Sequence, residues 1–311
     1  MKPVALFTHP ACLGHDMGPY HPECPDRLRV VLQALEHPNF ASLLREQAPE
    51  ATRDQLCLAH PASHVDRILA IRPAEDERVS IDPDTIVGHG SQQAMLRAAG
   101  GAIAAVDSVM EGWAGAAFAA IRPPGHHAEQ HRAMGFCFFN NAAIAARHAR
   151  TRWGLDRVAV VDFDVHHGNG TEDIFASDPS LFYASSHQHP CYPGTGSARD
   201  TGVANNVVNA PLPPGSGSAA FRAAWEDRII PALSAWQPQL LIISAGFDAH
   251  KADPLAELQI ETEDFAWLTD RLLDIADSHC RGRVVSLLEG GYDLGALAAS
   301  TASHVTRLMR I

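Results

Sequence analysis

The stretch Arg157–Phe175, RVAVVDFDVHHGNGTEDIF, is the most informative part of the sequence, because an apolar strand leads there directly into side chains that are able to bind a metal. Residues 158–161 are continuously apolar and mostly β-branched, which is typical of a strand buried on both faces of a parallel sheet. Open α/β sheets bind ligands at the carboxyl ends of such strands. Alternation along an extended chain then places Asp162, Asp164 and His166 on one face. The stretch therefore predicts an α/β protein with a polar site at this strand end.

A carboxylate and an imidazole two residues apart can bind one ion. Their oxygen and nitrogen donors suit zinc or a similar divalent cation. Alternatively, the same side chains could form turn hydrogen bonds at the strand end. Three ionisable groups on a buried strand favour the metal, because buried charges need a partner.

Composition limits the classes of function. The chain has 311 residues, 46% of them hydrophobic and 19% charged, which is ordinary for a soluble globular protein. A net charge of −12 without any Lys/Arg block argues against nucleic-acid binding. The six cysteines are scattered, so neither a disulfide framework nor a zinc knuckle is indicated. With no apolar run approaching ~20 residues, we expect a cytoplasmic protein that does not contact a membrane. The sequence gives no indication of the oligomeric state.

Strand and helix patterns alternate along the chain. This alternation predicts a single α/β domain over residues 1–311, with one parallel sheet and helices on both faces. No repeat, low-complexity segment or linker divides the chain. Residues 9–26 and 73–84 read as polar loops. Strands are expected at 4–8, 116–121, 158–161, 181–186, 207–212, 240–244 and 284–288, and helices at 26–35, 91–111, 140–153, 219–236, 263–279 and 294–309.

Four strand ends carry reactive side chains, and in a parallel sheet these ends share one edge. They are GHH at 125–127, DFDVHH at 162–167, GFDAH at 246–250 and GGY at 290–292. Asp248 is the natural third ligand beside Asp164 and His166, leaving an open position for water. On its own, Asp248 could equally cap a helix or a turn.

The other two clusters supply acid–base and oxyanion chemistry. His126 and His127 follow a rigid Pro-Pro-Gly turn, and two imidazoles beside a metal can act as general base and general acid. Alone, such a pair is more often solvated surface. Tyr292 could be a packing aromatic or, beside a metal, an oxyanion donor. No G-x-S-x-G elbow, P-loop or dinucleotide fingerprint is present.

Taken together, these motifs and their order resemble the histone deacetylase superfamily, and the Asn in HHGNG is similar to class II members and their bacterial amidohydrolase relatives. The resemblance covers nearly the whole chain. It rests on HDMGPYHPECPDRL at 15–28, RPPGHHA at 122–128, GFCFFNN at 135–141, DFDVHHGNGTEDIF at 162–175, PGTG at 193–196, SAGFDAHKADPL at 244–255 and EGGY at 289–292.

The resemblance implies a zinc amidohydrolase on an arginase-like fold, with one catalytic zinc per chain. The metal ligands would be Asp164, His166 and Asp248. The tandem catalytic histidines would be His126, paired with Asp162, and His127, paired with Asn169. Tyr292 would polarise the acetyl carbonyl.

Further roles follow from the same resemblance. Tunnel residues would be Gly135, Phe136, Tyr192, Leu255 and Gly290, and Arg27 would lie near an acetate exit. A potassium ion would bind carbonyls of Asp162, Asp164 and His166 beside Ser185, and a second cation would lie near Phe175. The ureohydrolases, which share the fold but use two manganese ions, would need acids where Gly168 and His250 stand.

The expected activity is hydrolysis of an acetylated amine such as acetyl-lysine to acetate and free amine. Two alternatives remain open. One is a deacetylase of acetylpolyamines or another small amide. The other is a non-catalytic acyl-lysine-binding module, which would be expected to have lost Tyr292 or a metal ligand.

Overall fold

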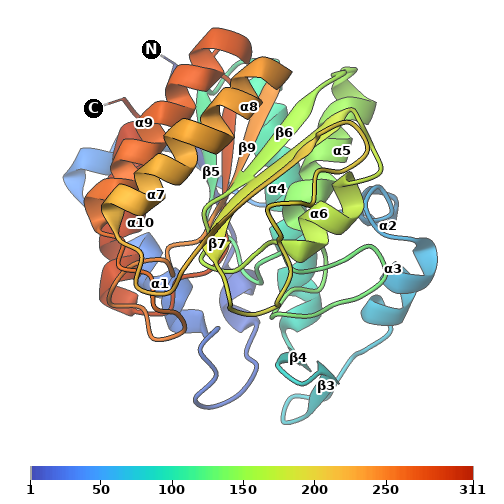
Figure 1. Ribbon diagram of the computed structural model, residues 1–311. Helices are drawn as coiled ribbons and strands as arrows, with labels where there is room; N and C mark the ends of the chain where they lie inside the picture. Colours follow the sequence, from blue (N-terminus) through green and yellow to red (C-terminus); the bar gives the residue numbers. More distant parts are fainter. Residues whose placement is uncertain (1, 311) are drawn as a thin grey trace.

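The fold is built on one sheet of eight strands, all paired in parallel, in the computed structural model, which describes residues 2–310. Across the sheet the order is β2-β1-β5-β10-β9-β6-β7-β8 (Figure 1). This confirms the predicted parallel α/β sheet. The strands are β1 (Val4–Thr8), β2 (Leu44–Gln47), β5 (Ala116–Ala119), β6 (Val158–Asp162), β7 (Leu181–Gln188), β8 (Val207–Leu212), β9 (Leu240–Ala245) and β10 (Val284–Leu288).

Strand β6 shows why the sheet is buried on both sides. Val158 and Val160 belong to one hydrophobic core, whereas Ala159 and Val161 belong to the other. All five residues of the strand are buried. Successive side chains of a strand point to opposite faces, so a continuous apolar run fills two cores at once.

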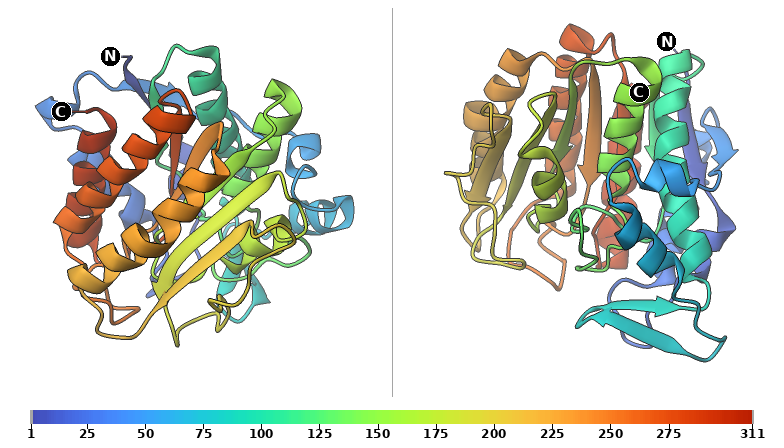
Figure 2. Two further views of the ribbon diagram at one scale, coloured as in Figure 1. Left: turned by 45° about the horizontal axis from the view of Figure 1, so that its top comes forward. Right: turned by 90° about the vertical axis from the view of Figure 1, so that its right-hand side faces the viewer.

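Helices cover both faces of the sheet (Figure 2). One face is covered by α4 (Ser91–Glu111), α5 (Asn141–Trp153) and α6 (Asn169–Phe175), whose buried side chains join the core of Val158. The other face is covered by helices whose side chains join the core of Ala159. These are α1 (Pro25–Ala34), α7 (Ser218–Ala224), α8 (Ile230–Trp236), α9 (Thr262–His279) and α10 (Leu294–Leu308).

Helix α5 ties the core to the loop that carries the histidine pair. It begins where the side-chain oxygen of Asn140 accepts the N–H of Ala143 at 2.9 Å, a typical N-cap. The amide nitrogen of Asn140 donates to the carbonyl of Ala128 at 3.2 Å. Because Ala128 directly follows His127, the helix start holds the loop in place. Gly154, at φ +66°, ends the helix in the left-handed conformation.

Most expected elements are found within one to three residues of their predicted ends, but six short α-helices and strands were missed. They are β2, α2 (Arg53–Leu56), α3 (Ala62–Leu69), α6 and the two strands of the hairpin, β3 (Arg78–Asp82) and β4 (Thr85–Gly88). Strand β2 lies at the sheet edge with all four residues exposed, so it carries no apolar pattern. The expected helix 219–236 contains a π turn at Trp225–Ile229, between α7 and α8. Within residues 2–310, no helix has the length and apolarity needed to cross a membrane.

Candidate active site

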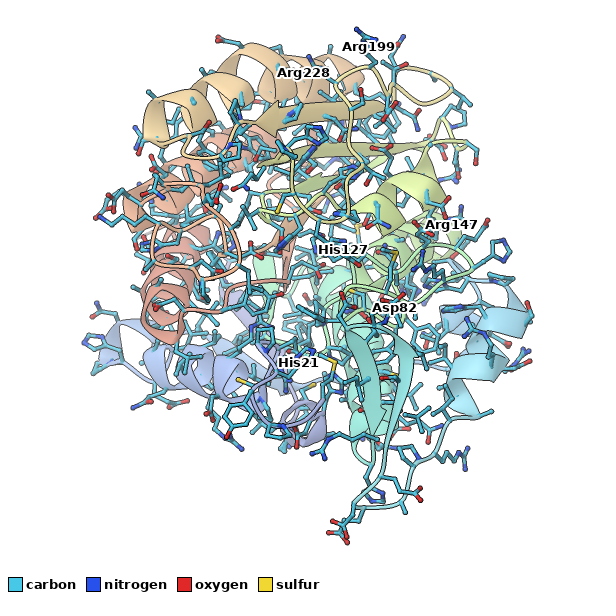
Figure 3. All side chains as sticks on the ribbon, turned by 60° about the horizontal axis from the view of Figure 1, so that its bottom comes forward. His21, Asp82, His127, Arg147, Arg199 and Arg228 are labelled. Carbon is cyan, nitrogen blue, oxygen red and sulfur yellow. The ribbon has the colours of Figure 1, made fainter. Side chains whose placement is uncertain are left out.

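The carboxyl edge of the sheet gathers the four predicted clusters. Figure 3 looks onto this edge, with His127 near its middle. Asp162 ends β6, and Asp164 and His166 follow it. Asp248 follows β9, and residues 289–292 follow β10. The parallel sheet therefore brings together segments that are far apart in sequence.

Three of these side chains form a candidate metal centre. One donor atom from each of Asp164, His166 and Asp248 can be chosen so that all lie within 4.8 Å of one another. His166 Nδ1 is 3.1 Å from Asp164 Oδ1 and 3.2 Å from Asp248 Oδ2. The exposed fractions of Asp164 and Asp248 are only 0% and 1%. Two buried carboxylates facing one imidazole nitrogen fit a divalent cation, which would neutralise them.

Two glycines make room for these carboxylates. A Cβ at Gly246 would lie 2.0 Å from Asp164 Oδ2, and one at Gly290 would lie 2.1 Å from Asp248 Oδ2. The N–H of Gly290 also donates to Asp164 Oδ2 at 2.8 Å. Gly290, predicted to line the substrate tunnel, instead lies against the candidate metal ligands. Burial and the charge of Asp164 raise the pKa of Asp248 to about 7, so the metal-free site resists a second negative charge.

The two adjacent histidines have different partners. His126 Nδ1 is 2.9 Å from Asp162 Oδ2, whereas His127 Nδ1 is 2.8 Å from Asn169 Oδ1. Burial alone would lower the pKa of His126, but the carboxylates of Asp164 and Asp162 outweigh it and raise that pKa to about 10. Burial and the neighbouring His126 and His166 instead lower the pKa of His127 well below its ordinary value. In the metal-free site, His126 is therefore favoured as the cation and His127 as the neutral imidazole.

A hydrogen-bond chain sets the tautomer of His127. Asn169 Nδ2 donates to Glu129 Oε1 at 2.7 Å, so Asn169 presents its oxygen to His127. That oxygen can only accept, so His127 carries its proton on Nδ1. The lone pair is left on Nε2, and His127 lines the cavity described below.

A buried carboxylate missed by the sequence reasoning lies beneath the pair. Glu289 Oε2 accepts the backbone N–H groups of Gly125 and His126 at 2.7 and 3.2 Å. Its other oxygen accepts the hydroxyl of Ser244 at 3.1 Å. Glu289 thus fixes the backbone that carries both histidines. Only its place in the EGGY motif hinted at such a role.

Tyr292 and Arg27 are stacked. The Arg27 guanidinium carbon lies 4.8 Å from the centre of the Tyr292 ring. Arg27 is fully buried and donates to the carbonyl of Gly291 at 2.6 Å and to Glu23 Oε1 at 3.0 Å. The backbone N–H of Tyr292 donates to Asp253 Oδ2 at 2.7 Å, and its side chain lines the cavity described below, where a substrate can reach it. A role for Arg27 in acetate exit stays a prediction.

A cavity of ≈ 230 Å³ leads to the site. Tyr192 and Leu255 are partly exposed at 38% and 37%, and they lie toward solvent. His127, His166 and Tyr292 lie at its inner part. Asp84, which the sequence reasoning did not identify, also contributes a carboxylate to the wall, because the missed β3–β4 hairpin carries it. The lining residues are Asp84, His127, Gly135, Phe136, His166, Tyr192, Leu255 and Tyr292.

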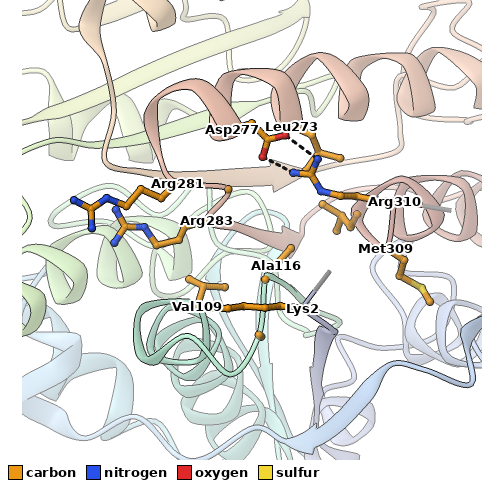
Figure 4. Close-up of a pocket in the computed structure, with 13 residues that line it drawn as sticks. Lys2, Val109, Ala116, Leu273, Asp277, Arg281, Arg283, Met309 and Arg310 are labelled. Atoms are coloured by element: carbon orange, nitrogen blue, oxygen red, sulfur yellow. Dashed lines mark hydrogen bonds and ion pairs between the residues drawn. The ribbon is translucent and has the colours of Figure 1, made fainter.

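A larger cavity of ≈ 290 Å³ lies at the other, amino-terminal edge of the sheet (Figure 4). Lys2, Arg281, Arg283 and Arg310 give it a basic wall, and Arg310 is bound to Asp277 through bonds of 2.8 and 2.6 Å. The cavity contains neither a histidine nor a pair of carboxylates. The smaller cavity, which touches the candidate metal centre, is therefore the candidate active site.

Comparison with known proteins decides the family. The histone deacetylase domain matches residues 21–308.

The chain belongs to the histone deacetylase family.

Similar proteins from a bacterium, a plant and an archaeon support this assignment. The chain is 37% identical to the histone deacetylase-like amidohydrolase of Pseudomonas aeruginosa, covering 93% of this chain and 81% of that protein. It is 40% identical to histone deacetylase 14, chloroplastic, of Arabidopsis thaliana, covering 98% and 76%. It is 37% identical to a probable deacetylase of Archaeoglobus fulgidus, covering 94% and 83%. The solved HDA15 HD domain matches 99% of this chain and 88% of its own, with a TM-score of 0.94 and 34% identity. The predicted resemblance is thereby confirmed.

Proposed function

We propose that the protein is a zinc-dependent deacetylase that hydrolyses an acetylated amine such as acetyl-lysine to acetate and the free amine. The observation that carries the proposal is the buried Asp164, His166 and Asp248 cluster beside a neutral His127 at the inner part of a narrow cavity. Nitrogen and carboxylate donors with an open position suit zinc. A divalent cation bound there would polarise the amide carbonyl and make a water more acidic.

The residues of this chain account for the proton transfers. His127, with its lone pair on Nε2, takes a proton from the attacking water as the water oxygen adds to the amide carbon. The Tyr292 hydroxyl donates to the carbonyl oxygen as negative charge develops on it, and the cationic His126 favours the same charge. When the C–N bond breaks, His127 returns the proton to the leaving amine. The products are acetate and the amine. His127 thus serves as base and then as acid, an assignment that the sequence left open.

A structural potassium ion is the second part of the proposal. In the turn after β6, backbone carbonyls that accept a hydrogen bond alternate with carbonyls that accept none. Val165 accepts the N–H of Gln188, and His167 accepts that of Asn169. The carbonyls of Asp164 and His166 accept none from residues 2–310. Ser185, paired in register with Asp162, lies on the adjacent strand. Unbonded carbonyls in a buried turn suit a monovalent cation beside these residues.

A narrower substrate choice rests on the cavity walls. The rings of Phe136 and Tyr192 suit the aliphatic stem of acetyl-lysine, and Leu255 adds an apolar rim. One observation favours acetylpolyamines as a second candidate, because the Asp84 carboxylate could meet their distant ammonium group. A non-catalytic binding module is disfavoured, since both histidines, Tyr292 and all three candidate ligands are in place.

The six free thiols fit a reducing compartment such as the cytoplasm.

A substrate panel tests the proposal. Zinc-loaded protein is assayed on acetyl-lysine peptides, acetylspermidine and longer acyl-lysine peptides, with and without a chelator. We expect acetate release that the chelator abolishes and a higher kcat/KM for the peptides than for acetylspermidine. Preference for the polyamine would overturn the substrate choice only. Absence of acetate release from the whole panel would overturn the deacetylase assignment.

A further inference from the structure

Three backbone carbonyls converge on one side-chain nitrogen in the turn between α6 and β7. The carbonyl oxygens of Phe175, Asp178 and Leu181 lie 2.9, 3.0 and 2.9 Å from Nδ2 of Asn206. Asn206 is fully buried, and its own carbonyl accepts the N–H of Tyr183 at 2.9 Å. Asn206 directly precedes β8, so its side chain reaches the turn from another part of the chain and is fixed there.

The arrangement is unusual for an amide. An –NH₂ group has two hydrogens, so three acceptors at nearly equal distance cannot each receive one of their own. Several carbonyl oxygens directed at one point are instead what a dehydrated monovalent cation requires. The amide nitrogen, with its partial positive charge, stands where such a cation would be coordinated. A neutral amide also avoids the larger desolvation cost of burying a full charge.

The turn after β6 is the informative contrast. There the carbonyls of Asp164 and His166 lack any hydrogen-bond donor among residues 2–310. In the turn after α6, by contrast, all three converging carbonyls contact the Asn206 amide, and those of Phe175 and Asp178 also accept the N–H groups of Asp178 and Leu181 at 2.9 and 3.1 Å. The residues near Phe175 therefore do not fit the second cation that the family resemblance implies.

We propose that the Asn206 amide replaces a monovalent cation in the Phe175–Leu181 turn, so that this turn is held together without an ion. The surrounding backbone supports a fixed position for the side chain. A Cβ at Gly202, which has φ +67°, would lie 2.2 Å from Asn206 Oδ1, so the segment folds closely over the amide. Removing the amide should turn the three carbonyls into a cation site.

The test compares thermal unfolding in potassium chloride and in choline chloride at equal ionic strength. In choline, Asn206→Ala should unfold roughly 5 °C or more below the wild type, because three buried carbonyls lose the amide and, within residues 2–310, only those of Phe175 and Asp178 keep a backbone N–H donor. In potassium it should recover part of that loss, since an ion that binds only the folded state stabilises it. The matched control is Asn140→Ala, which removes another buried amide but leaves no set of three converging carbonyls. We expect its potassium response to equal that of the wild type.

Rubidium, located in crystals by its anomalous scattering, gives a readout independent of stability. We expect a rubidium ion among the three carbonyls in Asn206→Ala crystals and none there in the wild type. A rubidium ion at this turn in the wild type would overturn the proposal. So would an Asn206→Ala protein with no rubidium there and the wild-type potassium response. If the alanine variant does not fold, Asn206→Ser serves in its place. None of these measurements uses enzymatic activity, so their outcome is separate from that of the proposed function.

Discussion

The charged side chains at the two ends of the eight strands differ in burial and in pairing. At the carboxyl ends, Asp164 and Asp248 are buried beside each other, and the pKa of Asp248 rises to about 7. At the amino ends, Arg310 and Asp277 form an ion pair whose side chains are 35% and 50% exposed. Burial of like charges opposes folding, whereas a solvated opposite pair has almost no net effect on it.

The two ends of the sheet therefore have different roles. A protein gains no stability by packing two carboxylates against each other, so the arrangement at the carboxyl ends has to be explained by what binds there. The amino-terminal cavity needs no such explanation, because water and Asp277 already satisfy its charges. Changes at one end should therefore alter activity, and changes at the other should alter stability slightly.

The largest expected effect is at Asp248. Asp248→Asn keeps the shape of the side chain and an oxygen for the N–H of Val165. It removes a metal ligand, and we expect deacetylation to fall by ~10³-fold or more. The metal-free variant should unfold at the same or a higher denaturant concentration than metal-free wild type, because one of two repelling carboxylates is gone. Metal analysis should give one tightly bound divalent ion per wild-type chain. Retained activity, or two such ions, would contradict the single-metal site.

Tyr292 should have the next largest effect. Tyr292→Phe keeps the ring that stacks on Arg27 and removes only the hydroxyl. Loss of one oxyanion donor typically lowers kcat by ~10²–10³-fold, while KM changes little. Steady-state kinetics on the preferred substrate measures both constants. A kcat close to that of the wild type would reduce Tyr292 to a packing residue.

The pairing of the two histidines predicts a shift in pH dependence. Asn169→Asp puts a negative charge 2.8 Å from His127 and should raise its pKa by about 1–2 units. A base works only when unprotonated, so the acidic limb of kcat/KM should move to higher pH, with activity lost below the new pKa. Asp162→Asn is the matched control at His126. If its profile moves and that of Asn169→Asp does not, His126 is the base.

The rim should give a smaller effect. Leu255→Glu adds a carboxylate at a position that is 37% exposed, where an ion pair contributes only 0.2–1 kcal/mol. The ratio of kcat/KM for acetylspermidine to that for an acetyl-lysine peptide should therefore rise by about 1.4- to fivefold. Leu255→Gln has similar size without charge and should leave the ratio unchanged. Equal kcat/KM ratios in both variants would mean that the Asp84 carboxylate already determines the charge at the cavity entrance.

The features that could be predicted from the sequence are those that depend on the periodicity of strands. A continuous apolar run identified β6, and the residues beyond it identified Asp164 and His166, since the edge of a parallel sheet collects strand ends. Edge elements such as β2 escaped because they bury no apolar face. The β3–β4 hairpin escaped for another reason, because β3 is mostly exposed and β4, although its Val87 is buried, has only four residues. Asp84 in the cavity wall was missed with it.

Contacts between distant segments could not be predicted from residue type. Glu289 reaches the backbone of Gly125, 164 positions away, and Asn169 is oriented by Glu129, 40 positions away. Asn206 is the clearest case, because nothing about an asparagine before β8 indicates that its amide will meet three carbonyls. Such positions are set by the packed fold, so they became visible only in the structure.

The smallest expected effect, at the amino-terminal cavity, is the strictest test of the comparison between the two ends. Asp277→Asn removes the one carboxylate among the described residues that line this cavity, beside Lys2, Arg281, Arg283 and Arg310. The loss of unfolding free energy should be at most about 1 kcal/mol, since the pair is solvated. It should shrink further in high salt, where like charges are screened. Asp270→Asn is the matched control, because it breaks a similarly exposed pair with Arg307, and neither of these residues lines this cavity. If repulsion within the cavity matters, the loss of unfolding free energy will depend on salt more strongly in Asp277→Asn than in Asp270→Asn. In both variants kcat/KM will stay at the wild-type value. A change of kcat/KM in Asp277→Asn would show that the two ends of the sheet are coupled, and the separation of function from stability would then be wrong.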